Sequence, residues 1–349
     1  MGRKTYRKII TSPELTEQIN KENIKLMNRF LREKNSRCSD TTVTNYSSDL
    51  HIFFTWNLLE NDNKDFYSIK KLEFSDFFIY CLEELKWGSA RFQRMKACLS
   101  SLSIYVEKYF DEEYPTFRNV ILKAIENMPK VARREKTVLT DEEMQGLLDY
   151  LFIEKKNYQE ACLLALACYS GARKSELLRF TTDNIDENNL AYGDLFIETT
   201  EKIKTKGRTK EGKMLYKYIL KEEFLPYYHK WLEKRKEIMD KHGKTHNALF
   251  IKRNGDPANV DNITGWIEKW NKNYLPENKP FYFHCTRHYF VSTLTRKECS
   301  SDFIVALVGW GSSDMYHIYN DVSDKDRKWK DIDKLKELYS KIDTEEDDE

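Results

Sequence analysis

The chain has 349 residues, 40% of them hydrophobic and 33% charged, which is typical of a soluble globular protein with two or three domains. Its 58 basic and 57 acidic residues nearly cancel, so any surface for nucleic acid must be local. Because no run of about 18 apolar residues occurs, no transmembrane helix is expected, and the basic start lacks the apolar part of a secretion signal. Seven cysteines without a CxxC pair favour reduced thiols in a cytoplasmic protein.

The first third of the chain shows helical periodicity. Residues 1–14 are basic and lack a periodic pattern, so we expect a flexible arm there. Residues 15–128 are expected to form a small helical domain. Its helices are predicted over 15–33, 42–59, 75–85, a segment that starts with Ser89 as its N-cap, and 116–127. A basic linker is then predicted over residues 129–139, which begin with a proline.

A second domain is expected over residues 140–325, because Thr140-Asp-Glu-Glu143 is a capping-box signature for a new helix. Its central helix is predicted near 158–170, where most faces are apolar, and it ends at Gly171. Segments 195–200 and 214–220 are rich in β-formers and predict a hairpin with Gly207 to Gly212 at the turn. Further helices are predicted over 222–241, 260–273, 284–297, 301–308 and, with an acidic end, 326–349. The fold class is therefore mainly α with a small β-sheet.

Two polar stretches of the second domain carry chemistry. They are Gly171-Ala-Arg173-Lys-Ser-Glu176 and His284-x-x-Arg287-His288, the latter followed by Gly309-Trp310 and Tyr319. A tyrosine phenolate can attack a phosphodiester, and guanidinium and imidazole donors stabilise the charge that grows on the phosphate oxygens. Guanidinium suits this role because its planar fork donates two hydrogen bonds and stays charged. On a helix, His284, Arg287 and His288 would approach one face.

These stretches resemble the two motifs of the tyrosine recombinases, the family of phage integrases and of Xer- and Cre-like enzymes. The step of nine from Trp310 to Tyr319 matches the family's step from its His/Trp position to its nucleophile. The resemblance implies an N-terminal helical, SAM-like core-binding domain and a mixed α/β catalytic domain with the DNA breaking-rejoining enzyme fold. It also implies cleavage of DNA by Tyr319 through a 3′-phosphotyrosyl intermediate, with no metal, ATP or other cofactor.

The resemblance implies a role for each matched residue. Charge stabilisation is implied for Arg173, His284, Arg287 and Trp310, with Glu176 and His288 in support. The indole of Trp310 can donate one hydrogen bond but cannot move a proton. Tyr316 and Tyr289 are the nearby tyrosines, and the spacing from Trp310 selects Tyr319 over them. A zinc site competes for the same stretch (His284, Cys285, His288 and Cys299), but adjacent residues point apart on a helix.

The proton for the leaving 5′ oxygen is, by the same resemblance, supplied by a lysine of the β-hairpin. Lys206 before Gly207 matches the Xer-like members, whereas Lys210 matches the Cre-like hairpin, and we favour Lys206. The basic residues of this segment are also typical of a solvated turn or of non-specific phosphate contacts; they are Lys202, Lys204, Lys206, Arg208, Lys210, Lys213 and Lys217.

DNA contacts are expected from local basic surfaces, although a solvated surface charge is the commoner role for any single lysine. The expected residues are Lys86, Arg91, Arg94, Lys96, Arg133, Arg134, Lys136, Lys204 and Arg208. The resemblance implies a double-stranded DNA recombination site as partner and a tetramer at strand exchange, with 326–349 docking into a neighbour. It also implies a nucleoid-associated, cytoplasmic protein of a prokaryote, phage or mobile-element host.

Four other interpretations stay open at this point: a type IB topoisomerase, a telomere resolvase, a sequence-specific DNA-binding protein of the same fold without catalysis, and a structural helical module that carries the motif by chance. The compact length and the helical first domain favour a recombinase. The DNA target, the accessory proteins and the choice among integration, excision and dimer resolution also stay open.

Overall fold

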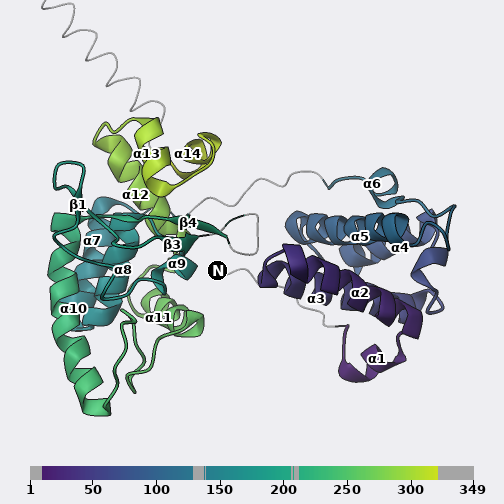
Figure 1. The fold of residues 1–349 in the computed structure, drawn as a ribbon, viewed down its shortest axis with the longest axis horizontal. Helices are drawn as coiled ribbons and strands as arrows, with labels where there is room; N and C mark the ends of the chain where they lie inside the picture. The colour runs from purple at the N-terminus through teal and green to yellow at the C-terminus, as the bar shows by residue number, and fades with distance from the viewer. Residues whose placement is uncertain (1–9, 129–136, 138, 206, 208–211, 321–349) are drawn as a thin grey trace, which may run out of the picture. The chain divides into compact units, whose positions relative to one another are not determined.

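The chain divides into two compact units, seen in a computed structural model that describes residues 10–128, 137, 139–205, 207 and 212–320 (Figure 1). Of the described residues, one unit contains 10–128 together with 207, 212 and 213, and the other contains 137, 139–205 and 214–320. Each has its own hydrophobic core. The described elements are mainly helices with small sheets, as predicted. Among these helices, none is both long and apolar enough to cross a membrane.

The N-terminal unit is helical. Its elements are α1 (Pro13–Gln18), α2 (Lys21–Arg37), α3 (Asp40–Glu60), the 3₁₀ turn η1 (Phe66–Ser68), α4 (Lys71–Glu83), α5 (Ser89–Tyr109) and α6 (Ile121–Ala124). Their shared core is strongly aromatic. Phe53 lies at its centre, with the ring centroids of five other aromatic residues 4.9 to 6.1 Å away. Three of these pairs are edge-to-face, a geometry that stabilises a core beyond the area it buries.

Two helix predictions in this unit are wrong. The single helix expected over 15–33 is two helices, because the Asn20 side chain accepts a hydrogen bond from the Glu22 N–H at 2.9 Å and starts α2 there. The helix expected over 116–127 is reduced to the single turn α6. Before that turn, the Asn119 amide donates to Ser100 Oγ at 2.9 Å, which fixes an irregular approach. Ser89 is the first residue of α5, and Gly88 is its N-cap.

The C-terminal unit surrounds one buried helix. Its helices are α7 (Asp141–Asp149), the π-helical turn η2 (Tyr150–Glu154), α8 (Tyr158–Ser170), α9 (Lys174–Leu177), α10 (Lys221–His242), α11 (Val260–Asn273), α12 (His284–Arg296), α13 (Ser301–Val308) and α14 (Asp314–Tyr319). Every residue of α8 from Glu160 to Ser170 is buried, and the helix packs against α10 and α12. The predicted capping box is present at the start of α7, where the Glu143 N–H donates to Thr140 Oγ1 at 3.2 Å.

The strands form two small sheets, and the three-stranded one is antiparallel. They are β1 (Leu190–Ala191), β2 (Phe196–Glu198), β3 (Ile203–Thr205), β4 (Lys213–Leu215) and β5 (Tyr218–Leu220). β2 lies between β1 and β5 and pairs Ile197 with Ile219, while β3 pairs with β4 separately. The two predicted β-segments therefore do pair. The predicted turn falls partly on residues 206 and 208–211, which lie outside the described residues.

Candidate active site

The corner between α8 and α9 carries the first motif. Gly171 ends α8 in the left-handed conformation with φ +59°, which glycine adopts without steric cost. A Cβ at this position would lie 2.7 Å from Cδ1 of Phe290 on α12, so the corner also packs too closely for a larger residue. The chain then turns at once into α9, and Arg173 projects from the corner.

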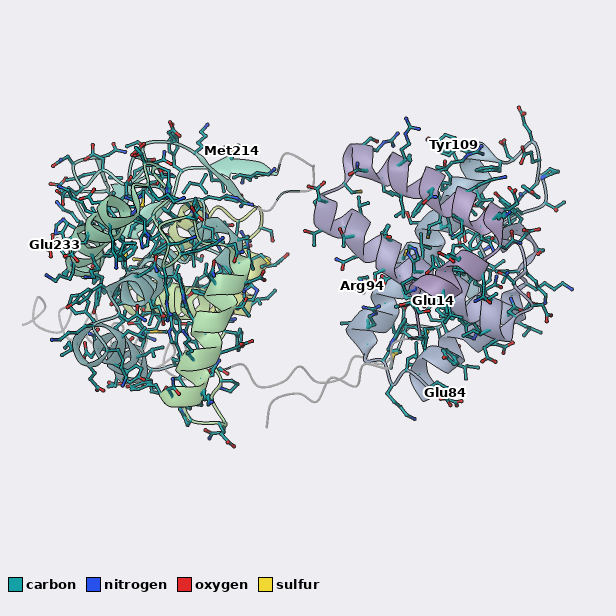
Figure 2. The ribbon with its side chains drawn as sticks, turned by 90° about the horizontal axis from the view of Figure 1, so that it is seen from below. Glu14, Glu84, Arg94, Tyr109, Met214 and Glu233 are labelled. Carbon is teal, nitrogen blue, oxygen red and sulfur yellow. The ribbon has the colours of Figure 1, made fainter. Side chains whose placement is uncertain are left out.

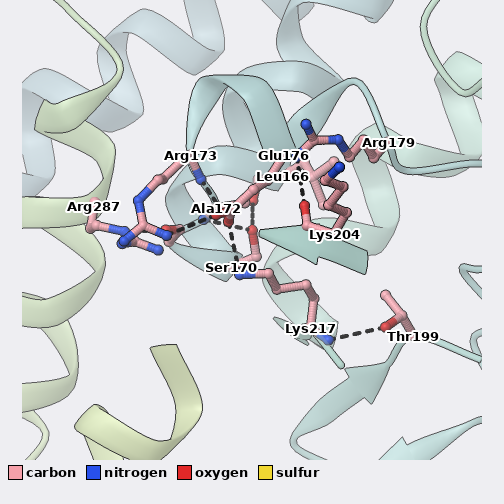
Figure 3. A network of polar contacts seen from close by, with 11 residues as sticks. Leu166, Ser170, Ala172, Arg173, Glu176, Arg179, Thr199, Lys204, Lys217 and Arg287 are labelled. Carbon is pink, nitrogen blue, oxygen red and sulfur yellow. Dashed lines mark hydrogen bonds and ion pairs between the residues drawn. The ribbon is translucent and has the colours of Figure 1, made fainter. Parts of the chain in front are cut away.

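Arg173 and Glu176 hold each other across this turn (Figure 3). The Arg173 Nη1 lies 2.8 Å from Glu176 Oε1, and the Arg173 backbone N–H donates to Oε2 at 3.1 Å. The Glu176 side chain is fully buried. Burial would raise the pKa of this carboxyl, but Lys217 and Arg173 lower it to about 2. Glu176 is therefore a charged anchor for the guanidinium of Arg173.

Arg287 comes from α12 and is 1% exposed. Its Nε donates to the Gly171 carbonyl at 2.7 Å, which links α12 to the α8–α9 corner. Its Nη1 and Nη2 are buried and hydrogen-bond to no atom of the described residues. Burial and the charge of Arg173 lower the pKa of Arg287 to about 10, so the group stays charged at neutral pH. Buried donors on a cation without an acceptor are costly in a protein unless an anion binds there.

Tyr319 ends α14 and lies in a ring of motif side chains. Its ring stacks on Trp310 at 5.2 Å between centroids and lies 4.6 Å from the ring of His288. His284, which is exposed at the start of α12, is 6.3 Å away. The Arg287 guanidinium lies 5.9 Å from the Tyr319 ring centre. The predicted nucleophile therefore lies near four of the residues predicted beside it: His284, Arg287, His288 and Trp310.

Trp310 follows the end of α13, where Gly309 adopts φ +75°. A Cβ on Gly309 would lie 2.3 Å from Leu215 Cδ1, so the tight turn that presents Trp310 needs glycine. The Trp310 Nε1 is buried and has no hydrogen-bond acceptor among the described residues. Its ring lies 5.7 Å from the Arg287 guanidinium. Two buried donor side chains therefore accompany the Tyr319 ring.

The two competing tyrosines have other contacts. The Tyr316 hydroxyl lies 3.1 Å from Thr295 Oγ1 and accepts a hydrogen bond from the Asn320 amide at 3.1 Å. Burial raises the pKa of Tyr289, and nearby acidic groups that include Asp141 raise it further, which opposes phenolate formation. The structure thus separates Tyr319 from both by its surroundings, where the sequence separated it only by spacing. The helix α14 itself was not predicted from the sequence.

The hairpin lysines have different fates. Lys206, Arg208 and Lys210 lie outside the described residues. Lys204 is exposed on β3, and its carbonyl accepts a hydrogen bond from Arg179 at 2.6 Å. Lys217 is 3% exposed, and its Nζ lies 2.8 Å from Glu176 Oε2 (Figure 3). It is therefore neither part of a solvated turn nor a surface contact for phosphate. The strand pattern could have indicated this, since Lys217 has the same inward parity as Ile219.

The basic residues expected to contact DNA in the N-terminal unit are partly committed to the fold. Lys96 does not fit that role: it is buried, and its Nζ donates to the Ile125 carbonyl at 2.5 Å and to Asn127 Oδ1 at 2.9 Å. Arg94 (Figure 2) makes two 2.8 Å bonds to buried Asp49 but remains 36% exposed.

Arg91 shares this carboxylate, with its Nη2 3.1 Å from Asp49 Oδ1. Lys86 is exposed. The linker residues Arg133, Arg134 and Lys136 lie outside the described residues. Arg91, Arg94 and Lys86 therefore keep enough exposure to meet a ligand, whereas Lys96 does not.

Comparison with known proteins identifies the class. Residues 137–326 match the phage integrase family. The SPbeta prophage-derived recombinase-like protein YomM of Bacillus subtilis (strain 168) is 31% identical over 253 residues, which is 70% of this chain and 71% of that protein. The putative tyrosine recombinase TTE1313 of Caldanaerobacter subterraneus subsp. tengcongensis is 29% identical over 175 residues, or 49% of this chain and 54% of that protein.

Solved structures share the fold. XerH site-specific recombinase bound to its palindromic difH substrate superposes with a TM-score of 0.62 at 16% identity, covering 87% of this chain and 82% of XerH. The Tn1549 transposon integrase with transposon right end DNA gives 0.60 at 15% identity, covering 90% and 99%. The fold is that of the DNA breaking-rejoining enzymes, and the class is that of the tyrosine recombinases. The chain belongs to the phage integrase family, and it is an enzyme that cleaves and rejoins DNA strands.

Proposed function

We propose that this protein is a site-specific recombinase that cuts double-stranded DNA with Tyr319 as nucleophile. The observation that carries the proposal is the pair of buried donors beside the Tyr319 ring: the terminal nitrogens of Arg287 and the indole N–H of Trp310, which no acceptor of the described residues fills. A scissile phosphate would supply acceptors to both. Arg173, fixed by Glu176, would add a second guanidinium to the same phosphate.

The proposed reaction is a transesterification at phosphorus. The Tyr319 phenolic oxygen forms a bond to phosphorus while the bond from phosphorus to the 5′ oxygen breaks, which leaves a 3′-phosphotyrosyl link. Since Trp310 cannot accept a proton, the phenolic proton goes to His284, whose imidazole nitrogen can accept one. His288 supports the Tyr319 ring, with the ring centroids 4.6 Å apart. The 5′ oxygen takes a proton from a hairpin lysine, for which Lys206 and Lys210 remain the candidates.

The reverse step reseals DNA without ATP, because the phosphotyrosyl link conserves the bond energy until a 5′ hydroxyl attacks it. Arg173 and Arg287 supply two positive charges at the phosphate, so no metal ion is required for charge stabilisation. We therefore expect EDTA to have no effect on the reaction.

We further propose a domain role for each unit. Residues 15–128 would act as the core-binding domain, residues 140–325 as the catalytic domain, and residues 326–349 as a docking segment between protomers of a tetramer. The λ integrase structure is a dimer bound to a core site, and XerH is bound to difH, which supports a double-stranded DNA site as the partner here. The prophage origin of the Bacillus relative supports action in the cytoplasm of a prokaryotic, phage or mobile-element host.

The test is covalent trapping. The full-length protein is incubated with nicked duplexes made from the repeats that flank its gene, because a nick beside the cleavage site lets the leaving strand diffuse away. We expect an adduct that survives denaturation and EDTA, disappears in Tyr319→Phe, and persists in Tyr316→Phe, whose hydroxyl is engaged by Thr295 and Asn320.

Three outcomes would overturn the proposal. They are no adduct with the wild type on any such duplex, an adduct that Tyr319→Phe retains, and an adduct that EDTA abolishes. Relaxation of supercoiled DNA of arbitrary sequence, lost in Tyr319→Phe, would point instead to a type IB topoisomerase.

A further inference from the structure

Lys217 is a buried lysine that the proposed chemistry does not use. It precedes β5 and is held by backbone contacts to the residue after β2: its N–H donates to Thr199 Oγ1 at 3.0 Å, and its carbonyl accepts from the Thr199 N–H at 2.9 Å. Because alternate residues of a strand share a face, Lys217 points inward like Ile219, which is fully buried. The backbone therefore directs the Lys217 side chain into the C-terminal unit, where its ammonium is buried.

The ammonium meets the carboxylate that anchors the first motif. Lys217 Nζ lies 2.8 Å from Glu176 Oε2, while Glu176 Oε1 accepts from Arg173 Nη1 at 2.8 Å. The Glu176 side chain is fully buried and Lys217 only 3% exposed, so the contact is shielded from water. Glu176 thus bridges a lysine on one side and the arginine of the site on the other (Figure 3).

The charges of this cluster do not balance. Arg173, Lys217 and Arg287 are cations around the single carboxylate of Glu176, which leaves a surplus of two positive charges. Burial lowers the pKa of Lys217, the Glu176 carboxylate opposes that shift, and both arginines add to it. Arg173 already neutralises the charge of Glu176 through Oε1, so charge balance within this pair does not by itself require a second cation at residue 217. Stability alone therefore does not explain Lys217, whereas an anion at the arginines would.

We propose that Lys217 is a positioning residue for the phosphate-binding arginines: its ammonium fixes Glu176, which fixes Arg173, and its charge helps to stabilise the negative charge that grows on the scissile phosphate during attack. Lys217 itself touches no DNA in this arrangement. The inference rests on the proposed function, because it assigns the anion to the phosphate that Tyr319 attacks. Lys217 is thus a third positive charge beside the two guanidiniums, and it acts on them through Glu176.

The test compares Lys217→Met and Lys217→Gln with the wild type, using the full-length protein on the nicked duplex that traps the wild type. Methionine removes charge and hydrogen bond, while glutamine removes the charge and retains a donor for Glu176. Lys230→Met is the matched control, since Lys230 also pairs with a glutamate, Glu233 at 2.6 Å, but is 46% exposed on α10. DNA affinity and the rate of adduct formation at saturating DNA are measured separately.

We expect both Lys217 variants to bind the duplex with affinity close to wild type and to form the adduct about tenfold to a hundredfold more slowly, the range usual for residues that orient a reactive group. Lys230→Met should match the wild type. A methylphosphonate at the scissile position removes the phosphate's negative charge, so the deficit of both variants should shrink toward wild type on that substrate. A structural defect alone would give the same deficit on both substrates.

The outcomes separate this inference from the proposed function. No adduct with the wild type means that the proposed function fails. Wild-type rates in both Lys217 variants, or equal deficits on the phosphodiester and the methylphosphonate, overturn the role of Lys217 while the recombinase assignment stands. If Lys217→Met shows no cooperative thermal transition, Lys217→Gln carries the comparison, since it keeps a partner for the buried carboxylate.

Discussion

At the scale of single residues, the site depends on charges that the protein buries without balancing them. Arg287 is 1% exposed and uses only its Nε on the protein, while its terminal nitrogens have no acceptor among the described residues. Glu176 partly offsets this buried positive charge. It pairs with Arg173 and Lys217, and it lies close enough to Arg287 to raise the pKa of that group. Under the proposed function, these donors are in place for the phosphate before DNA binds.

The depressed pKa of Glu176 predicts how the protein responds to acid. Its pKa falls from the usual 4.5 to about 2 on folding, so the stability it contributes is full above pH 4.5 and is lost as the pH falls toward 2. Linkage sets this loss at about 1 kcal/mol by pH 3.5. The destabilisation caused by Glu176→Gln should therefore be largest at neutral pH and shrink by that amount at pH 3.5.

Urea unfolding of both proteins between pH 7 and 3.5 measures this difference. Taking the difference between variant and wild type removes the contributions of other carboxylates. A gap in unfolding free energy that is constant with pH, or that widens as the pH falls, would show that Glu176 is not held ionised by Lys217 and Arg173.

At the scale of elements, the site is assembled where helix ends meet. The C-terminus of α8, the start of α12 and the short α14 contribute Gly171, Arg287 and Tyr319. The Arg287 bond to the Gly171 carbonyl joins the first two of these elements. The sequence predicts α8, α11, α12 and α13 well because each has a clear apolar stripe or a cap. It misses α14, which spans only Asp314–Tyr319 and is too short to show a period.

Gly171→Ala should destabilise the protein, and Gly265→Ala should not. At Gly171 the positive φ costs about 1 kcal/mol for alanine, and a Cβ 2.7 Å from Phe290 forces repacking that costs roughly another 1–3 kcal/mol. At Gly265, within α11, an added Cβ meets nothing within 4 Å, so alanine should stabilise the helix by up to about 1 kcal/mol. Chemical unfolding measures the free energy of unfolding of each variant, which should fall for Gly171→Ala and rise slightly for Gly265→Ala.

The adduct rate is a second measure of the same change. Gly171→Ala should slow it because Arg173 leaves its position, whereas Gly265→Ala should leave it at wild type. Equal stability of the two variants would contradict the close packing of the α8–α9 corner against α12.

At the scale of the whole molecule, the chain has two hydrophobic cores that share no residue. The N-terminal core gathers around Phe53, and the C-terminal core around α8. Each unit is within the size range of domains that fold alone. Division of this kind lets one unit supply DNA contacts and the other the chemistry, as proposed above.

A fragment of residues 1–134 should therefore fold by itself. We expect a helical circular dichroism spectrum and one cooperative thermal transition, because the aromatic core of this unit is internal to it. Phe53→Ala in the same fragment should lower the free energy of unfolding by about 3–5 kcal/mol, since it empties the centre of that core. A broad, non-cooperative melt of the parent fragment would instead mean that its core needs the second unit.

The fold class, the two-part helical organisation and the motif residues could be predicted from local patterns, because caps, periodic stripes and motif spacings are features of neighbouring positions in the chain. The sequence named Arg173, Glu176, Arg287, Trp310 and Tyr319 without a structure. Which charges are buried became visible only in the folded chain. The tertiary structure placed Lys217 against Glu176, turned Lys96 inward and engaged the Tyr316 hydroxyl, since burial depends on strand pairing and helix packing between segments far apart in the sequence.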